Sequence, residues 1–161
     1  NAVLLAGLEI LERHTHSLYD PRGAYVPAGR DAMVTRVGHA DFRFRNSTAA
    51  PLRIEAHARG GILDIRLLGH QRVHKDRWIE TELVEKKPLA LQQVLDPNLQ
   101  PGERRRVRQG FDGLRVRSQV CWANAAGVTR CASLGVDDYM KVNERWKVGP
   151  DSLSATASEA P

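Results

Sequence analysis

Apolar residues near the start of the chain recur at the spacing of a helix. Leu4, Leu8 and Leu11 form one stripe, and apolar neighbours widen it to almost every face. The sequence therefore predicts a helix over residues 1–12 that is buried on most sides rather than resting on a surface.

Alternation of apolar and polar residues replaces the helical spacing further along the chain. It predicts short strands over residues 32–35, 42–45 and 52–58, and the last two have one dry and one wet face. A Gly-Gly turn at residues 60–61 connects the third strand to a fourth over residues 62–68, which makes a hairpin. This first region is thus expected to be one helix backed by an antiparallel sheet.

A second region of different composition begins near residue 72, and its signals are those of strands. The predicted strands cover residues 78–84, 103–110, 114–122, 127–132 and 141–148, with a single helical turn as a candidate at residues 89–95. Three parts follow: residues 1–71, an extended all-β module over residues 72–150, and a small-sided polar tail at residues 151–161 that is expected to be disordered. The predicted fold class is α+β, with a buried N-terminal helix packed on a small antiparallel sheet.

The two cysteines, Cys121 and Cys131, flank a turn-like stretch centred near Ala126. If the strands on either side pair about this centre, the cysteines are cross-strand neighbours with Cβ atoms about 4.5–5.5 Å apart, which a disulfide can close. The alternative is two separate thiols packed on a sheet. A disulfide would indicate an oxidising, extracytoplasmic compartment. Two cysteines alone make a poor metal site, so no metal is expected.

The 161-residue chain is basic, with 24 lysines and arginines against 19 acidic residues and a formal net charge of +5. This balance favours anionic surroundings. One dense cluster, Arg104, Arg105, Arg106 and Arg108, is a candidate anion-binding site, and the alternative is an ordinary solvated strand face. A nucleotide-binding loop and the interleaved aromatic residues of single-stranded nucleic-acid binders are absent from the sequence, so neither a cofactor nor nucleic acid is expected.

Four motifs of the first region have a distinctive combination of residues. They are NAVLLAGLE at residues 1–9, ERHTHS at residues 12–17, YVPAGRDA at residues 25–32 and DFRFRNST at residues 41–48. Through them the chain resembles the VanW-like family of bacterial envelope proteins over roughly its first 70 residues. Thr15 stands where this family is expected to carry proline.

The second region resembles a G5 domain, an extended β module named for its glycines that often follows a VanW-like domain. Its glycines stand where turns and strand ends require them, at Gly102, Gly110, Gly113, Gly127 and Gly149. The paired cysteines are not part of the G5 pattern. Together the two resemblances imply an extracellular protein that binds cell-wall sugars.

The VanW-like resemblance also implies a candidate catalytic arrangement. Such domains usually carry a Cys-Gln pair just before the helix with which this chain begins, so the chain is expected to be a piece of something longer. With that cysteine as the nucleophile, His14 or His16 would be the base and Asp31 would orient it. The alternatives are histidines bonded to backbone carbonyls at a helix end, and an Asp31 that caps a loop or strand. Neither Cys121 nor Cys131 lies in a suitable context, so the chain alone is not expected to be catalytic.

These features predict an accessory protein of the bacterial envelope, located outside the cytoplasm as a secreted, wall-bound or membrane-anchored protein. Any membrane tether would lie outside this chain. The expected partner is peptidoglycan or another wall glycan, or a second envelope protein, and open β edges would allow the chain to join an extracellular assembly. The alternative function is the part of a cysteine-dependent wall-modifying enzyme that lacks the nucleophile.

Overall fold

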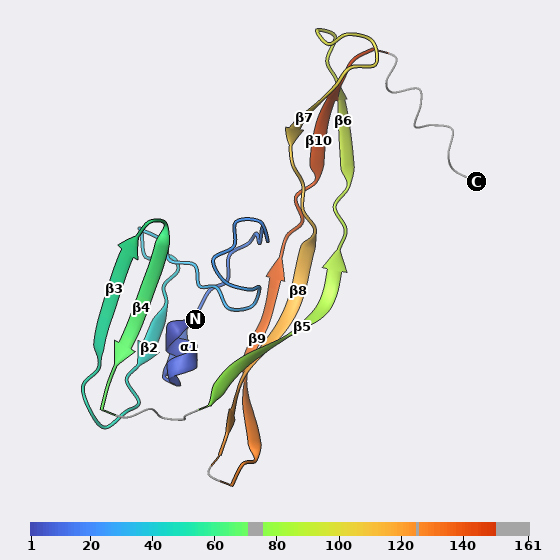
Figure 1. Cartoon of the computed structure of the whole chain (residues 1–161). Coiled ribbons are helices and arrows are strands. Elements are labelled where there is room, and N and C mark those ends of the chain that lie inside the picture. The colour runs from blue at the N-terminus through green and yellow to red at the C-terminus, as the bar shows by residue number, and fades with distance from the viewer. Residues whose placement is uncertain (71–75, 125, 151–161) are drawn as a thin grey trace.

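The computed structural model describes residues 1–70, 76–124 and 126–150. Strands dominate these ranges, which contain one short helix, α1 (Figure 1). In chain order the elements are α1 (Ala2–Ala6), β1 (Glu9–Glu12), β2 (Arg43–Arg45), β3 (Arg53–Arg59), β4 (Ile62–Leu68), β5 (Arg77–Lys87), β6 (Leu91–Leu95), β7 (Arg104–Arg108), β8 (Gly113–Ala123), β9 (Thr129–Tyr139) and β10 (Glu144–Val148). The chain is therefore mostly β, and the α+β prediction holds only in part. The predicted boundary near residue 71 and the predicted tail lie outside the described residues.

The predicted N-terminal helix is wrong in its second half. Gly7 has a left-handed backbone with φ 82°, and its N–H donates to the carbonyl oxygen of Leu4, which ends α1 at Ala6. The next residues, Glu9–Glu12, alternate exposed and partly buried side chains and pair with β2 as strand β1. The core instead takes Leu4 from the helix and Ile10 from the strand, whereas Leu11 of the predicted stripe is 49% exposed.

Two further predictions are corrected, and the hairpin is confirmed. Residues 32–35 lie in an irregular loop rather than a strand. The candidate helical turn at residues 89–95 is instead strand β6, which runs parallel to β10. The hairpin of β3 and β4 pairs from Arg53 with Leu68 to Arg59 with Ile62. Sequence spacing alone could not place β6, because its partner lies about 50 residues away in the chain.

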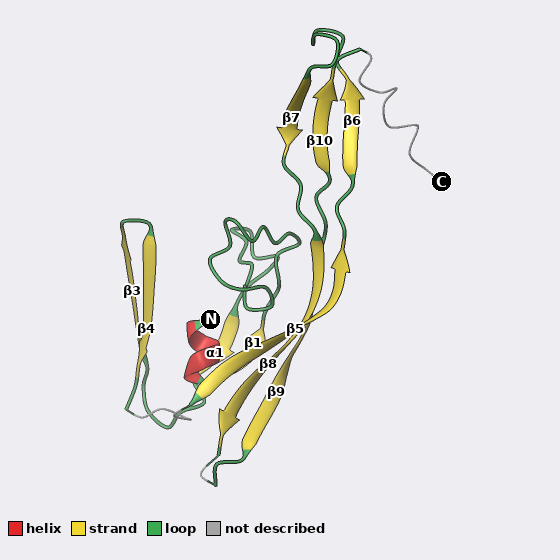
Figure 2. Cartoon of the chain, turned by 45° about the vertical axis from the view of Figure 1, so that its right-hand side comes forward, coloured by secondary structure: helices red, strands yellow, loops and turns green. Residues whose placement is uncertain are grey.

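The strands of the described residues form four sheets, and the two three-stranded sheets lie end to end (Figures 1 and 2). The proximal sheet has the order β5-β8-β9, and the distal sheet has the order β6-β10-β7. Two smaller sheets, β1-β2 and β3-β4, belong to the N-terminal region, residues 1–70. This region lies beside the proximal sheet and leaves the distal sheet standing alone (Figure 2).

The connection between the proximal and distal sheets, which we call the neck, is held by close backbone contacts. Phe111 and Val142 exchange two backbone hydrogen bonds of 2.9 and 3.0 Å there. A side chain at Gly110 or Gly113 would collide with the backbone of the segment that leads into β10. The carboxylate of Asp112 accepts the backbone N–H of Leu89 at 2.8 Å, and this bond, with an ion pair to a neighbouring lysine, holds the pKa of Asp112 below its usual value.

The apolar core lies between the N-terminal region and one face of the proximal sheet. Leu4, Ile79 and Val120 are buried at its centre, and the side chains of Ile10, Trp122 and Leu134 pack against them. Full burial of a side chain such as Leu4 contributes about 1.5–3 kcal/mol. An apolar cavity of about 280 Å³ continues this core between α1 and the hairpin of β3 and β4. Among the described residues, no helix is long and apolar enough to cross a membrane.

Candidate functional site

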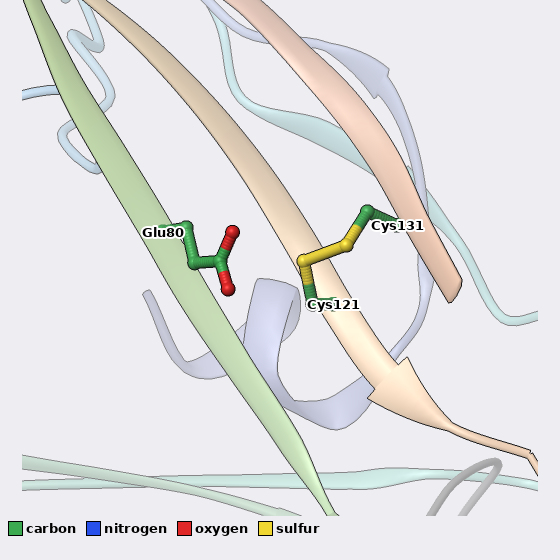
Figure 3. A group of neighbouring side chains, drawn as sticks. All are labelled: Glu80, Cys121 and Cys131. Carbon is green, nitrogen blue, oxygen red and sulfur yellow. A yellow bond between two sulfur atoms is a disulfide. The ribbon is translucent and has the colours of Figure 1, made fainter. Parts of the chain in front are cut away.

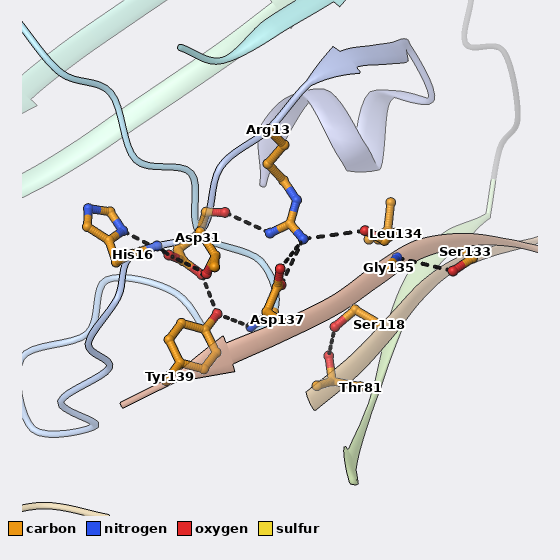
Figure 4. Close-up of polar contacts among 12 residues, drawn as sticks. Arg13, His16, Asp31, Thr81, Ser118, Ser133, Leu134, Gly135, Asp137 and Tyr139 are labelled. Carbon is orange, nitrogen blue, oxygen red and sulfur yellow. Dashed lines mark hydrogen bonds and ion pairs between the residues drawn. The ribbon is translucent and has the colours of Figure 1, made fainter. Parts of the chain in front are cut away.

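A group of polar side chains, the junction cluster, connects the N-terminal region to the proximal sheet (Figure 4). At its centre, one carboxylate oxygen of Asp31 accepts the backbone N–H of His16 at 2.8 Å and ring Nδ1 of the same residue at 2.8 Å. The other oxygen accepts the hydroxyl of Tyr139, and the Thr15 hydroxyl lies 3.2 Å away. The Gly29 N–H donates in turn to the Tyr139 oxygen at 2.7 Å. The Asp31 carboxylate thus joins the loop that carries His16 to strand β9, which carries Tyr139.

Arg13 extends the junction cluster along β9. Its guanidinium donates to both carboxylate oxygens of Asp137 at 2.7 Å and to the backbone carbonyl of Asp31 at 2.9 Å. The two charged side chains are 9% and 8% exposed, so they form a buried ion pair. Removing one partner of such a pair leaves an uncompensated buried charge, which is strongly destabilising.

The structure brings His16 and Asp31 together, as the VanW-like resemblance implied, and leaves His14 apart. His14 Nε2 lies 3.0 Å from a carboxylate oxygen of Glu12 on the exposed side of the chain. Both histidines follow strand β1 rather than a helix, which corrects the predicted placement at a helix end. The His16 side chain is 53% exposed, and with Nδ1 on Asp31 its Nε2 has no hydrogen-bond partner among the described residues. An imidazole oriented in this way is the geometry that a general base requires.

Electrostatics keep the Asp31 carboxyl ionised and the Tyr139 hydroxyl protonated at neutral pH. Burial acts to raise the pKa of the Asp31 carboxyl, but the hydrogen bonds from His16 and Tyr139 outweigh it and hold this pKa below its usual value. Burial also raises the pKa of the Tyr139 hydroxyl, and its bond to Asp31 raises it further. Asp31 is therefore an acceptor and Tyr139 a donor.

Cys121 and Cys131 form a disulfide, as the hairpin centre predicted. They are directly paired across β8 and β9, with Cα atoms 4.1 Å apart. Glu80 on β5 lies beside them, and the potential ligand atoms of all three residues lie within 4.8 Å of one another (Figure 3). The sulfurs of a disulfide are not thiolates, so this group is not a metal site while the bond is intact.

The face of the proximal sheet that points away from the core carries an exposed aromatic side chain. Trp78 pairs directly with Cys121 and is 37% exposed. Its indole N–H donates to Glu80 at 2.8 Å, and the amide of Gln119 donates to the second oxygen of Glu80 at 2.7 Å. These bonds lower the pKa of Glu80, so the group stays ionised at neutral pH. We call Trp78, Glu80 and Gln119 the Trp78 platform.

The four arginines predicted as one anion site lie on both faces of β7 and have different partners. Arg105 lies 3.9 Å from the carboxylate of Asp96, and Arg108 donates to a backbone carbonyl at 3.0 Å. Arg104 and Arg106 instead lie over the indole ring of Trp146, at 5.3 and 5.8 Å from its centre. The structure therefore separates two arginines that contact an indole ring from two on the other face of the strand.

With an elongated β fold and a polar junction described, the comparisons with known proteins show what the first region is similar to. Residues 1–68 match the model of the family described as VanW like protein. YoaR of Bacillus subtilis (strain 168), described as an uncharacterized protein, is 46% identical over 67 residues, which are 42% of this chain. The chain spans 21% of the length of YoaR. Residues 1–68 are thus a VanW-like segment, as the four motifs predicted.

The solved structures similar to this chain include two named for G5 domains. The structure of HP0197-G5 is 17% identical, covers 47% of this chain and 100% of its own, and has a TM-score of 0.27. The IgA1 protease G5 domain is 13% identical, covers 48% of this chain and 93% of its own, and has a TM-score of 0.32. The fold of the second region is argued from its own strand register and contacts.

Several residues of these sites were not found by reading the sequence. Tyr139 reaches Asp31 across 108 positions of the chain, and Arg13 reaches Asp137 across 124, so no local pattern could indicate either contact. Trp78 offered a usable signal, because a tryptophan and a glutamate two positions apart share one face of a strand.

Proposed function

We propose that this chain is a glycan-binding module of the bacterial cell envelope that holds a sugar on the Trp78 platform. The observation that carries the proposal is an exposed tryptophan on an open sheet face, held by a carboxylate that also bonds an amide. An indole ring offers a flat apolar surface to the C–H face of a pyranose. Glu80 and Gln119 beside it supply the acceptors and donors that sugar hydroxyl groups need.

The Trp78 platform has the rigidity that favours binding. Trp78 and Glu80 lie on β5, and the neighbouring strand β8 is joined covalently to β9 by the disulfide. A site whose side chains are already ordered loses less entropy when the ligand arrives. The disulfide and the VanW-like segment support a location outside the cytoplasm.

Assembly through β edges is a weaker explanation of the exposed strands than ligand binding. Bulges interrupt both edges of the proximal sheet, at Val84 in β5 and at Leu134 in β9. Charged side chains alternate along β5 as well. Both features oppose the addition of a further strand. A second envelope protein as partner therefore remains an outcome of the binding test rather than the proposal.

The test is retention of the purified chain on peptidoglycan, followed by salt titration. Trp78→Ala should lower the affinity at least about tenfold, and Trp78→Phe should lower it less, because a ring remains. Glu82→Gln is the matched control, since Glu82 lies further along the same face and pairs with Arg117. Unchanged retention of Trp78→Ala would show that the Trp78 platform is not the binding site. Complete loss of wild-type retention at moderate salt would show that charge alone causes the binding.

A second function is favoured by the bond between His16 and Asp31, the geometry of an oriented base. Both cysteines of this chain are in the disulfide, so a thiol nucleophile would come from another segment. In a protein that carries this segment and a free cysteine, iodoacetamide should label that cysteine rapidly at neutral pH, and His16→Gln should slow the labelling at least about tenfold. Labelling at the rate of a free thiol in both proteins would exclude the enzyme function.

A further inference from the structure

The distal sheet carries a charged aromatic surface that the Trp78 platform does not include. The strand register places Trp146 directly opposite Arg106, and Val148 opposite Arg104, so all four side chains lie on one face. Both guanidinium groups lie over the Trp146 indole ring. We name the row Arg104, Trp146 and Arg106 the arginine ladder.

Positive charge on the arginine ladder is only partly compensated. Arg106 lies 4.0 Å from Glu144, whose carboxylate also accepts the Trp146 indole N–H at 2.6 Å. Arg104 has neither an ion pair nor a hydrogen bond among the described residues, and both arginines are exposed. The opposite face is different, because Asp96 there pairs with Lys147 at 2.9 Å and lies 3.9 Å from Arg105.

The cation–π contacts with Trp146 leave N–H donors of the two guanidinium groups available to bind anions. A guanidinium that lies over an indole uses its flat face in the cation–π contact and keeps its N–H edge free. That edge matches the two oxygens of a carboxylate or a phosphate. The two arginines stand two positions apart in the strand, so their Cα atoms are about 6.6–6.8 Å apart. The arginine ladder therefore presents two forks in a row along the strand.

The geometry points to a binding site for a polyanionic polysaccharide on the arginine ladder, with each fork holding one carboxylate or phosphate group of the polymer. Leu91 and Leu95 lie on the same face, 52% and 50% exposed, and provide apolar contact for the sugar carbons between the charges. Nucleic acid fits less well, because the single indole already carries two guanidinium groups and leaves little ring surface for base stacking.

Matched double variants of the full chain test the site. Arg104→Gln/Arg106→Gln and Arg105→Gln/Arg108→Gln each remove two positive charges from the same strand. Affinity is measured on polygalacturonate for carboxylates, on a glycerol phosphate polymer for phosphates, and on dextran as the neutral polymer. The first double variant should lose at least about tenfold in affinity for one or both polyanions, and the second less than about threefold. Dextran should not be retained.

Three outcomes would overturn the site. Equal losses in the two double variants would mean that net charge alone binds the polymer. Unchanged binding in both would place the anion site elsewhere. Single-stranded DNA of matched charge bound as tightly as the polysaccharides would assign the ladder to nucleic acid. Trp78→Ala should keep its polyanion affinity, so failure of the Trp78 platform and failure of the ladder are distinguishable. Circular dichroism of each variant checks that the sheets remain folded.

Discussion

The proximal and distal sheets have the same number of strands, but only the proximal sheet has a face covered by the N-terminal region. One face of the proximal sheet is covered by α1 and β1 and bonded to a loop through Arg13 and Asp31. The distal sheet stands beyond the neck with no layer of the described chain packed on either face (Figure 1). Leu91, Leu95 and Val107 remain between 45% and 52% exposed there. Among the described residues of its strands, only Val148 of β10 is fully buried, so the stability of this single layer depends on that side chain together with backbone pairing and the contacts around Trp146.

This difference assigns different tasks to the two sheets. The proximal sheet keeps one face for the core and one for the Trp78 platform, so its stability and its proposed binding are separated by the pleat. On the distal sheet, the cation–π contacts around Trp146 serve both purposes, since they fill the surface and display the charges. Substitutions should therefore be separable in their effects on the proximal sheet and coupled on the distal sheet.

The largest effect on this contrast is expected at the buried pair of Arg13 and Asp137. Arg13→Gln should lower the free energy of unfolding by about 3–5 kcal/mol, because it leaves Asp137 buried and unpaired. Urea denaturation measures the loss, and hydrogen exchange should show faster opening of β9 than of β10. Arg117→Gln removes an exposed pair on the other face and should cost less than about 1 kcal/mol.

A companion variant separates charge from packing at this pair. Arg13→Met/Asp137→Leu removes both charges and should recover much of the stability that Arg13→Gln loses. If Arg13→Gln is as stable as the wild type, or if it opens β9 and β10 equally, the N-terminal region does not stabilise the proximal sheet selectively.

Local signals in the sequence predicted the strands whose partners are close in the chain. The hairpin of β3 and β4 followed from its Gly-Gly turn and the alternation beside it, and the pairing of Cys121 with Cys131 followed from a count about Ala126. The N-terminal helix was predicted too long, because Leu4 and Ile10 pack in one core although α1 carries the first and β1 the second. An apolar pattern indicates which residues are buried but not the backbone conformation that buries them. Here the left-handed Gly7 sets the end of the helix.

The candidate sites likewise contain residues that the sequence indicated and contacts between them that it could not. His16 and Asp31 could be paired in advance only through a family resemblance, because the contact spans a loop of irregular structure. The arginine cluster was visible, yet its meaning depended on a register with β10 that contains a bulge. Alternation along β7 separates Arg104 and Arg106 from Arg105. Only the position of Trp146 on the neighbouring strand shows which of the two faces combines arginines with an indole ring.

The next effect in size concerns the disulfide, which is confined to the proximal sheet. Cys121→Ser/Cys131→Ser should lower the free energy of unfolding by about 2–4 kcal/mol, because the unfolded chain regains the freedom of the loop. Intact mass of the wild type should rise by two hydrogens on reduction. Hydrogen exchange should accelerate at the tip of β8 and β9 and stay unchanged in the distal sheet. Equal acceleration in both sheets would mean that the neck transmits the loss.

The smallest of these effects, at Asp31, depends on pH. The folded-state pKa of this carboxyl lies below its usual value, so its contribution to stability is present above the unfolded pKa of about 3.9 and is lost as the pH falls through the folded pKa. Asp31→Asn keeps the shape and weakens the acceptor, so it should cost about 1–3 kcal/mol at pH 7. The difference between wild type and variant should shrink as the pH falls below about 4.

Asp20→Asn is the matched control for this pH dependence. The pKa of Asp20 is also lowered, by hydrogen bonds from Arg22, but its side chain is exposed and lies outside the junction cluster. Urea midpoints measured from pH 3 to pH 7 should therefore separate from the wild type for Asp31→Asn and much less for Asp20→Asn. A gap for Asp31→Asn that stays constant down to pH 3 would show that Asp31 acts through its shape and not its charge. The charge that matters for the covered face of the proximal sheet would then be that of Arg13, in its pair with Asp137.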